Sequence, residues 1–148
     1  MKEIPLTNSS EKALVDDEDF IELSKSKWFS QGGYAYETTR CKTRMHQLLI
    51  SCPPDKKVDH IDRNRLNNQR SNLRVATNSQ NAINKEFPNR LGYRGVKHNR
   101  GKYEAQITLN NEYKYLGRFS SIHDAAKAYN EAAIKFHGEF AVLNKITQ

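Results

Sequence analysis

The chain has 148 residues, which is enough for one compact domain or two small ones and too few for a large multidomain enzyme. Its 24 Lys and Arg exceed its 17 Asp and Glu, so the formal net charge is +7, and no apolar run approaches the roughly 18 residues of a membrane-spanning helix. Two cysteines without a CxxC pair exclude a disulfide scaffold and a four-thiolate zinc site within one chain.

Charge is unevenly distributed along the chain. Residues 1–23 carry a net charge of −5, residues 24–90 carry +8 and residues 91–148 carry +4. The acidic start leaves no apolar stretch for a secretory signal, so we expect a cytoplasmic, intracellular protein with no membrane partner. The two basic segments favour a polyanionic partner, with nucleic acid first.

The first 56 residues predict short strands and one short helix. Aromatic residues on both sides of Gly32 and Gly33 predict a hairpin with a glycine turn. Residues 43–50 have apolar side chains at helical spacing, and Pro53 with Pro54 then interrupts the chain. Residues 1–40 are given no chemistry and are expected to form a platform of strands.

Residues 57–86 are polar and rich in Asn and Arg. Val58 and Ile61 predict a short strand, and the capping-box sequence at residues 77–80 predicts a helix from about Asn78 to about Lys85. Residues 87–91, which include Pro88, predict a short linker between two domains.

The last 58 residues predict a three-stranded antiparallel sheet packed on one helix. Strands are expected at residues 94–97, 102–109 and 112–119, with Asn110 and Asn111 as the second turn. Ser120 or Ser121 caps a helix whose apolar stripe is rich in alanine, and Gly138 ends it. Short strands and helices in both halves predict an α+β fold.

The polar middle segment has a spacing that suits phosphodiester hydrolysis. Asp59 directly precedes His60, Asn72 follows twelve residues after His60, and Asn81 follows nine residues after Asn72. An imidazole with an ordinary pKa near 6.5 suits a base that activates water, and Asp and Asn oxygens suit Mg²⁺ or Mn²⁺. An Asp-His pair without such spacing is more typical of a surface ion pair or of a satisfied group in the core.

Residues 43–86 resemble the HNH endonucleases, whose fold is a β-hairpin and a helix around one metal ion. The resemblance is carried by residues 58–62, 66–68, 71–74 and 78–84. It implies that His60 is the general base, that Asn72 is the middle Asn of the catalytic motif, holding its loop and orienting the base, and that one Mg²⁺ or Mn²⁺ ion binds Asp59 and Asn81. Asp62 and Asn84 remain alternative ligands, and His46 is either structural or part of the site.

Residues 92–145 resemble the DNA-binding domain of plant ethylene-response factors, the APETALA type, because five blocks occur in order, at residues 93–97, 101–107, 115–119, 124–130 and 141–144. That family lays its sheet in the major groove of DNA. The resemblance implies a DNA face made of Arg94, Lys97, Arg100, Lys102, Tyr103, Gln106, Tyr115 and Arg118. Lys97 replaces an Arg of the family, so the plant target sequence does not transfer.

The two resemblances together predict a metal-dependent DNA endonuclease of the homing type, as borne by phages and introns. Residues 1–88 would hydrolyse phosphodiester bonds in double-stranded DNA, and residues 91–148 would position them on the target. One site per chain predicts strand nicking by a monomer or weak dimer, without a small-molecule cofactor, in a bacterial host cell if phage-borne. The alternative is a non-catalytic DNA-binding transcription regulator with a degenerate HNH half. An RNA-directed protein is disfavoured, because duplex RNA hides its major groove from such a sheet.

Overall fold

The structure is a computed structural model that describes residues 1–39, 43–85, 89–109 and 112–146. The chain divides into two compact units, Met1–Asn78 and Ser79–Gln148. The division comes before the expected linker at residues 87–91, of which residues 87 and 88 lie outside the described ranges. Cys41 and the expected turn at Asn110 and Asn111 also lie outside them.

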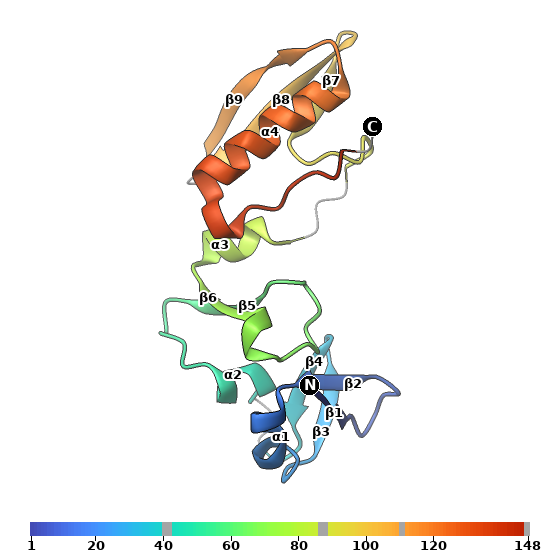
Figure 1. Ribbon diagram of the computed structural model, residues 1–148, viewed down its shortest axis with the longest axis vertical. Helices are drawn as coiled ribbons and strands as arrows, with labels where there is room; N and C mark the ends of the chain where they lie inside the picture. The colour runs from blue at the N-terminus through green and yellow to red at the C-terminus, as the bar shows by residue number, and fades with distance from the viewer. Residues whose placement is uncertain (40–42, 86–88, 110–111, 147–148) are drawn as a thin grey trace. The chain divides into compact units, whose positions relative to one another are not determined.

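The first unit is built from β-hairpins and short helices (Figure 1). Antiparallel pairs are formed by β1 (Lys2–Pro5) with β2 (Lys12–Val15), β3 (Trp28–Gln31) with β4 (Tyr34–Glu37), and β5 (Lys57–His60) with β6 (Leu73–Ala76). Between them lie α1 (Asp17–Leu23), α2 (Met45–Leu49) and the 3₁₀ turn η1 (Arg70–Asn72). The hairpin β3–β4 and helix α2 confirm the sequence prediction, whereas α1 and β6 were not predicted.

The turn between β3 and β4 explains the need for two glycines. Gly32 and Gly33 have φ angles of 58° and 79°, and Gln31 pairs directly with Tyr34. A two-residue hairpin turn with positive φ at both positions is the form that best matches strand twist, and it favours glycine. The turn therefore fixes the register of the hairpin that carries Tyr34.

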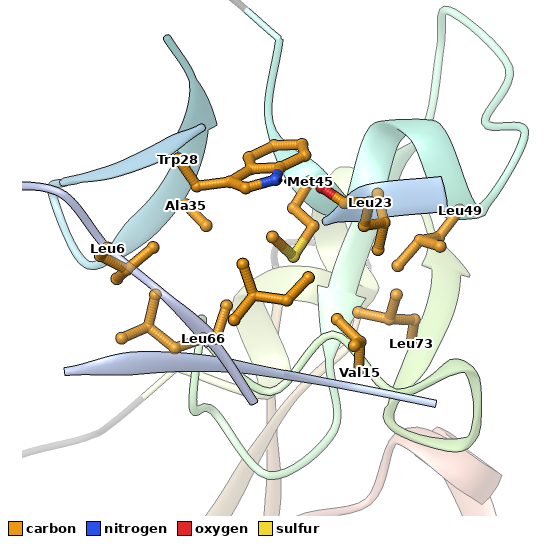
Figure 2. Close-up of a cluster of buried hydrophobic side chains, with 11 residues drawn as sticks. Leu6, Val15, Leu23, Trp28, Ala35, Met45, Leu49, Leu66 and Leu73 are labelled. Atoms are coloured by element: carbon orange, nitrogen blue, oxygen red, sulfur yellow. Dashed lines mark hydrogen bonds between the residues drawn. The ribbon is translucent and has the colours of Figure 1, made fainter. Parts of the chain in front are cut away.

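The core of the first unit depends on the N-terminal residues. The indole of Trp28 is 1% exposed, contacts the fully buried Met45 and donates from Nε1 to the carbonyl of Leu23 at 2.8 Å (Figure 2). The buried cluster comprises Ile4, Leu6, Ala13, Val15, Leu23, Trp28, Ala35, Met45, Leu49, Leu66 and Leu73. Most of these side chains come from residues 1–40, so the β5–β6 segment packs on a body that the N-terminal segment supplies.

The second unit has the predicted three-stranded sheet packed on one helix, which confirms the α+β fold. Its strands are β7 (Val96–Asn99), β8 (Lys102–Leu109) and β9 (Glu112–Phe119), in the order β7-β8-β9 (Figure 1). Helix α4 (Ile122–His137) is capped by the Ser121 hydroxyl and ends at Gly138, before the 3₁₀ turn η2 (Gly138–Phe140). Helix α3 (Asn78–Ile83) begins at the last residue of the first unit, and its other residues open the second unit. No helix of the described residues has the length and hydrophobicity needed to cross a membrane.

Close packing between the sheet and α4 depends on small residues. Ala125, Ala126 and Ala133 are fully buried beneath the sheet. Gly95 has a φ of 73°, and a Cβ at this position would lie 2.1 Å from a ring carbon of Tyr129. A side chain at residue 95 would therefore force the helix and the sheet apart, which is why β7 begins directly after a glycine.

Candidate functional site

His60 ends β5 and is almost completely buried, with 4% of its surface exposed. Its Nε2 lies 3.3 Å from Oδ1 of Asn68, whose Nδ2 donates to the carbonyl of Leu66 at 3.1 Å. The second bond fixes the amide so that its oxygen faces the imidazole. A neutral His60 therefore carries its proton on Nε2 and keeps its lone pair on Nδ1.

Asn68 is held in place by the N-terminal hairpin. The amide of Leu14 donates to the carbonyl of Leu66, and the amide of Asn68 donates to the carbonyl of Leu14, both at 2.8 Å. Asn68 is 1% exposed. Residues 66–68 carry part of the family resemblance, but no role was predicted for Asn68, because an Asn within an Asn-rich stretch looks like part of a solvated loop. Strand β2 thus positions the residue that fixes the tautomer of His60.

Two further rings surround His60. The ring of His46, on α2, lies edge-on at 5.1 Å between centroids, and the ring of Tyr34, on β4, lies at 6.0 Å. Tyr34 and His46 also contact one another at 5.5 Å. His46 is 4% exposed. The sequence left His46 open between a structural role and a role in the site, and the structure places it directly against His60.

Burial keeps both imidazoles neutral. It lowers the pKa of His46 to about 4, with further lowering from the nearby charges of His60 and Arg44. Burial also lowers the pKa of His60, against the opposing effects of the Asn68 hydrogen bond and the Asp62 carboxylate. At neutral pH His60 is therefore a neutral base that can accept a proton.

Asp59 is buried beside His60 and faces a cation across the hairpin. It is 5% exposed and pairs in the β5–β6 register with Arg74. The Nη2 and Nε atoms of Arg74 lie 2.9 and 3.0 Å from Oδ2 of Asp59. This pair compensates the buried carboxylate and holds its orientation. The sequence did not predict Arg74, because strand β6 was not recognised.

Asn72 acts on the loop that follows His60. It accepts from the Asp62 amide at 3.0 Å, and its Nδ2 donates to Oδ1 of Asp62 at 2.9 Å and to the carbonyl of Asn67 at 2.8 Å. Asn72 was predicted as a catalytic-site residue that holds this loop and orients the base. Its amide closes the loop in the structure, and its part in catalysis stays a prediction.

Asp62, an alternative metal ligand in the sequence analysis, is the other half of this loop network. Burial tends to raise its pKa, but hydrogen bonds from the side chains of Asn67 and Asn72 and from the amide of Asn64 outweigh burial and hold the pKa below its ordinary value. Asp62 is therefore ionised at neutral pH and serves as the acceptor around which the loop folds.

Acidic residues near the start of the chain bind Arg70, at the end of the same loop. Arg70, in η1, bonds Asp19 through Nη2 at 2.7 Å and through Nε at 2.8 Å, and its amide donates to Asp16 at 2.8 Å. Among the described residues, Asp16, Glu18 and Asp19 are also the only group of three or more His, Cys, Asp or Glu side chains whose ligand atoms lie within 4.8 Å of one another. Because these carboxylates contact Arg70, we assign them a structural role.

The oxygens proposed for the metal are chemically suitable. Asp59 offers a carboxylate and Asn81 an amide oxygen, a donor set that suits a hard cation whose other positions are filled by water and phosphate. Asn81 lies on α3 and is half-buried, and the alternative ligand Asn84 is buried just beyond the helix. Asp59 belongs to the first unit and Asn81 to the second, so their joint action as ligands stays a prediction.

The sheet of the second unit has one face against α4 and one open face. Ala105 and Ile107 of β8 are buried beneath α4, so the alternate positions of β8 and their cross-strand partners lie on the open face. That face carries Lys97, Asn99, Lys102, Glu104, Gln106, Thr108, Tyr113, Tyr115 and Arg118. Five of the predicted DNA-face residues are among them, and Arg100 lies exposed in the β7–β8 turn.

Two predicted DNA-face residues lie elsewhere. Tyr103 pairs with His98 and Phe119 and packs against the core beneath α4, because it shares a strand face with Ala105 rather than with Lys102. The guanidinium of Arg94 donates to the carbonyls of Ile83 and Lys85, at the end of α3. The structure therefore corrects the assignment of both side chains to the open face.

The open face combines cations with exposed aromatic rings. Tyr113 and Tyr115 are 75% and 62% exposed, and Nζ of Lys97 lies 5.7 Å from the ring centroid of Tyr113. Nη2 of Arg118 donates to the carbonyl of Asn99 at 3.1 Å. Tyr113 was missed by the sequence analysis, although its register position opposite Thr108 places it on this face.

The two regions match different groups of known proteins. Residues 51–83 match the family model described as HNH endonuclease. The chain is 36% identical over 132 residues to an uncharacterised HNH endonuclease, L560, of Acanthamoeba polyphaga mimivirus, and the alignment covers 84% of this chain and 70% of that relative. Its C-terminal part is 45% identical over 56 residues to the ethylene-responsive transcription factor WRI1 and 48% identical over 56 residues to the AP2-like ethylene-responsive transcription factor AIL5, both of Arabidopsis thaliana.

The plant alignments cover 35% of this chain and only 13% and 10% of the plant proteins, so they concern one module. The viral alignment covers most of both chains. The segment that matches the family model contains β5, the loop closed by Asn72, and β6. The chain belongs to the HNH endonuclease family.

Proposed function

We propose that the protein is a metal-dependent DNA endonuclease of the homing type that nicks one strand of duplex DNA, with His60 as its general base. The observation that carries this proposal is the buried, neutral imidazole whose Nε2 proton is directed to Asn68. Nδ1 of His60 then accepts a proton from the attacking water. The Asp59 and Asp62 carboxylates favour the imidazolium that forms.

HNH nucleases generally use a divalent metal ion. One Mg²⁺ or Mn²⁺ ion, held by Asp59 and Asn81, would polarise the scissile phosphate and stabilise the leaving oxygen. Arg74 fixes the Asp59 carboxylate from the neighbouring strand. Asn72 and Asp62 keep the loop after His60 closed, so the base and the ligand beside it remain on one rigid hairpin.

The open face of the β7-β8-β9 sheet would hold the protein on duplex DNA. Its support is the set of exposed cations and tyrosines together with the likeness to transcription factors of the ethylene-responsive type. Lys97, Lys102 and Arg118 would bind phosphates or base edges, and Tyr115 would contact sugars or bases. Because each phosphate contact releases counterions, binding should weaken steeply with salt.

The test is a pair of measurements on the variant His60→Ala. We expect the variant to lose cleavage of duplex DNA while its affinity in a gel shift stays near that of the wild type. His60 is buried, so it serves the chemical step and contributes little to DNA affinity. Loss of both together would show that His60 is structural. The variant Asn81→Ala should raise the metal concentration needed for half-maximal cleavage and leave DNA affinity unchanged.

The alternative function, a DNA-binding regulator with an inactive nuclease half, predicts a different result. The wild type would then bind duplex DNA but would not cleave it, whichever divalent ion is added. We also propose that the protein acts as a monomer or weak dimer, which sedimentation of the full chain with and without duplex DNA would test.

A further inference from the structure

Two arginines of the first unit stack on one tyrosine next to His60. Cζ of Arg44 lies 4.9 Å from the ring centroid of Tyr34, and Cζ of Arg65 lies 4.7 Å from it. The same ring lies 6.0 Å from that of His60. Tyr34 therefore brings two guanidinium groups to the neighbourhood of the proposed base.

Both guanidinium groups are held in place by neutral acceptors. Nε of Arg44 donates to the Tyr36 hydroxyl at 2.8 Å, and Nη1 of Arg65 donates to the carbonyl of Gly32 at 2.9 Å. The stem of Arg65 lies across Gly33, where its Cδ would stand 3.6 Å from an added Cβ. The β3–β4 turn thus orients Arg65 as well as Tyr34.

Two other arginines of the first unit have acidic partners. Arg70 pairs with Asp19, and Arg74 pairs with Asp59. For Arg44 and Arg65, no ion pair with a carboxylate is found among the described residues. Two like charges gathered on one ring without an acid between them repel each other, so an external anion would relieve an unfavourable arrangement.

We propose that Arg44 and Arg65 form a phosphate-binding site, held together by Tyr34, that binds the DNA backbone next to the bond that is hydrolysed. This inference rests on the proposed nuclease function for the identity of the anion. A guanidinium group matches phosphate with two parallel N–H donors, which suits a site that must orient a strand as well as attract it. The charge of Arg65 also reaches His60, and that of Arg44 reaches His46, which agrees with their placement beside both imidazoles.

The experiment measures the affinity of the full chain for a duplex of mixed sequence across a salt series, with EDTA present so that no DNA is cleaved. Each phosphate contact contributes about 0.9 to the slope of log affinity against log salt. The variants Arg44→Gln and Arg65→Gln should each lower that slope by about one. Lys27→Gln is the matched control, since Lys27 is an exposed cation of the same unit, and it should leave the slope unchanged.

Arg65→Lys keeps the charge, so its salt slope should equal that of the wild type. Its affinity should be weaker, because lysine lacks the planar guanidinium group with its parallel N–H donors. If Arg44→Gln fails to fold for want of its bond to Tyr36, Arg65→Gln alone decides the question. A wild-type slope in a folded Arg65→Gln protein would overturn the phosphate site. Absence of cleavage by the wild type with any divalent ion would instead refute the nuclease proposal, and a lowered slope would then still establish the phosphate contacts.

Discussion

The contact between Asn68 and His60 leads to a prediction about pH dependence. The substitution Asn68→Asp keeps an acceptor for Nε2 of His60 but adds a negative charge at the 3.3 Å contact. At a separation of roughly 4 Å and an effective dielectric constant of about 20, unit charges interact by about 4 kcal/mol. At about 1.36 kcal/mol per pKa unit, the pKa of His60 can rise by up to about three units.

The sign of the effect on activity follows from the role of His60 as a base. Activity should rise with pH as the imidazole loses its proton. In the wild type, burial lowers the pKa of His60, so this rising limb of the pH profile lies below the ordinary histidine pKa. In Asn68→Asp the carboxylate favours the imidazolium, so the limb should move to higher pH by one unit or more. The assay is the rate of single-turnover cleavage of duplex DNA measured against pH.

A matched control separates contact with His60 from charge in general. Asn64 is exposed on the same loop, and its Oδ1 accepts from the amide of Leu66 at 3.1 Å. Asn64→Asp keeps that acceptor and adds the same charge, so its pH limb should remain near that of the wild type. If Asn68→Asp folds and its pH limb coincides with that of Asn64→Asp, then His60 is not the titrating base or Asn68 is not its partner.

Three further predictions concern stability and binding. Gly95→Ala should destabilise the protein by at least about 3 kcal/mol in thermal unfolding, through positive φ and the clash with Tyr129, and an unchanged Tm would contradict this. Tyr115→Ala should weaken DNA affinity without lowering the Tm, whereas Tyr103→Ala should lower the Tm, so the reverse pattern would show that the two faces are misassigned. The pKa of His46 is lowered to about 4, so stability should be full above pH 6.5 and fall by about 3 kcal/mol as the pH falls to about 4, as urea unfolding would measure; His46→Gln should remove most of this dependence.

The second unit was the more predictable half. Its strands show period-two alternation and its helix shows an alanine stripe, so local pattern and tertiary packing agree. Tyr103 was placed on the DNA face because of the family resemblance, although the alternation of the strand predicts the opposite face. Strand parity places Tyr103 with the buried Ala105, and parity governs which face a side chain meets.

The first unit was predicted less fully, because its site is assembled from segments that are distant in sequence. His60, Asp59 and Asn72 were found by their spacing. Asn68 and Arg74 were not, since each acquires its role only through a partner on another element, Leu14 in β2 for one and Asp59 across the hairpin for the other.

Helix α1 escaped prediction for a physical reason. It spans seven residues, Asp17–Leu23, with acidic side chains in its first turn, and so short a helix is stable only through tertiary contacts. Its contact partner Arg70 lies 51 residues beyond Asp19, which no local pattern can reveal.

The most direct test of the central claim is the cleavage of supercoiled plasmid DNA by the full chain with Mg²⁺ or Mn²⁺, beside EDTA and beside His60→Ala. We expect conversion to open circles that requires the metal and is absent in the variant. A linear product would indicate paired cuts and contradict nicking by a monomer. No conversion with any divalent ion, together with a clear gel shift, would contradict the nuclease assignment and leave a DNA-binding protein.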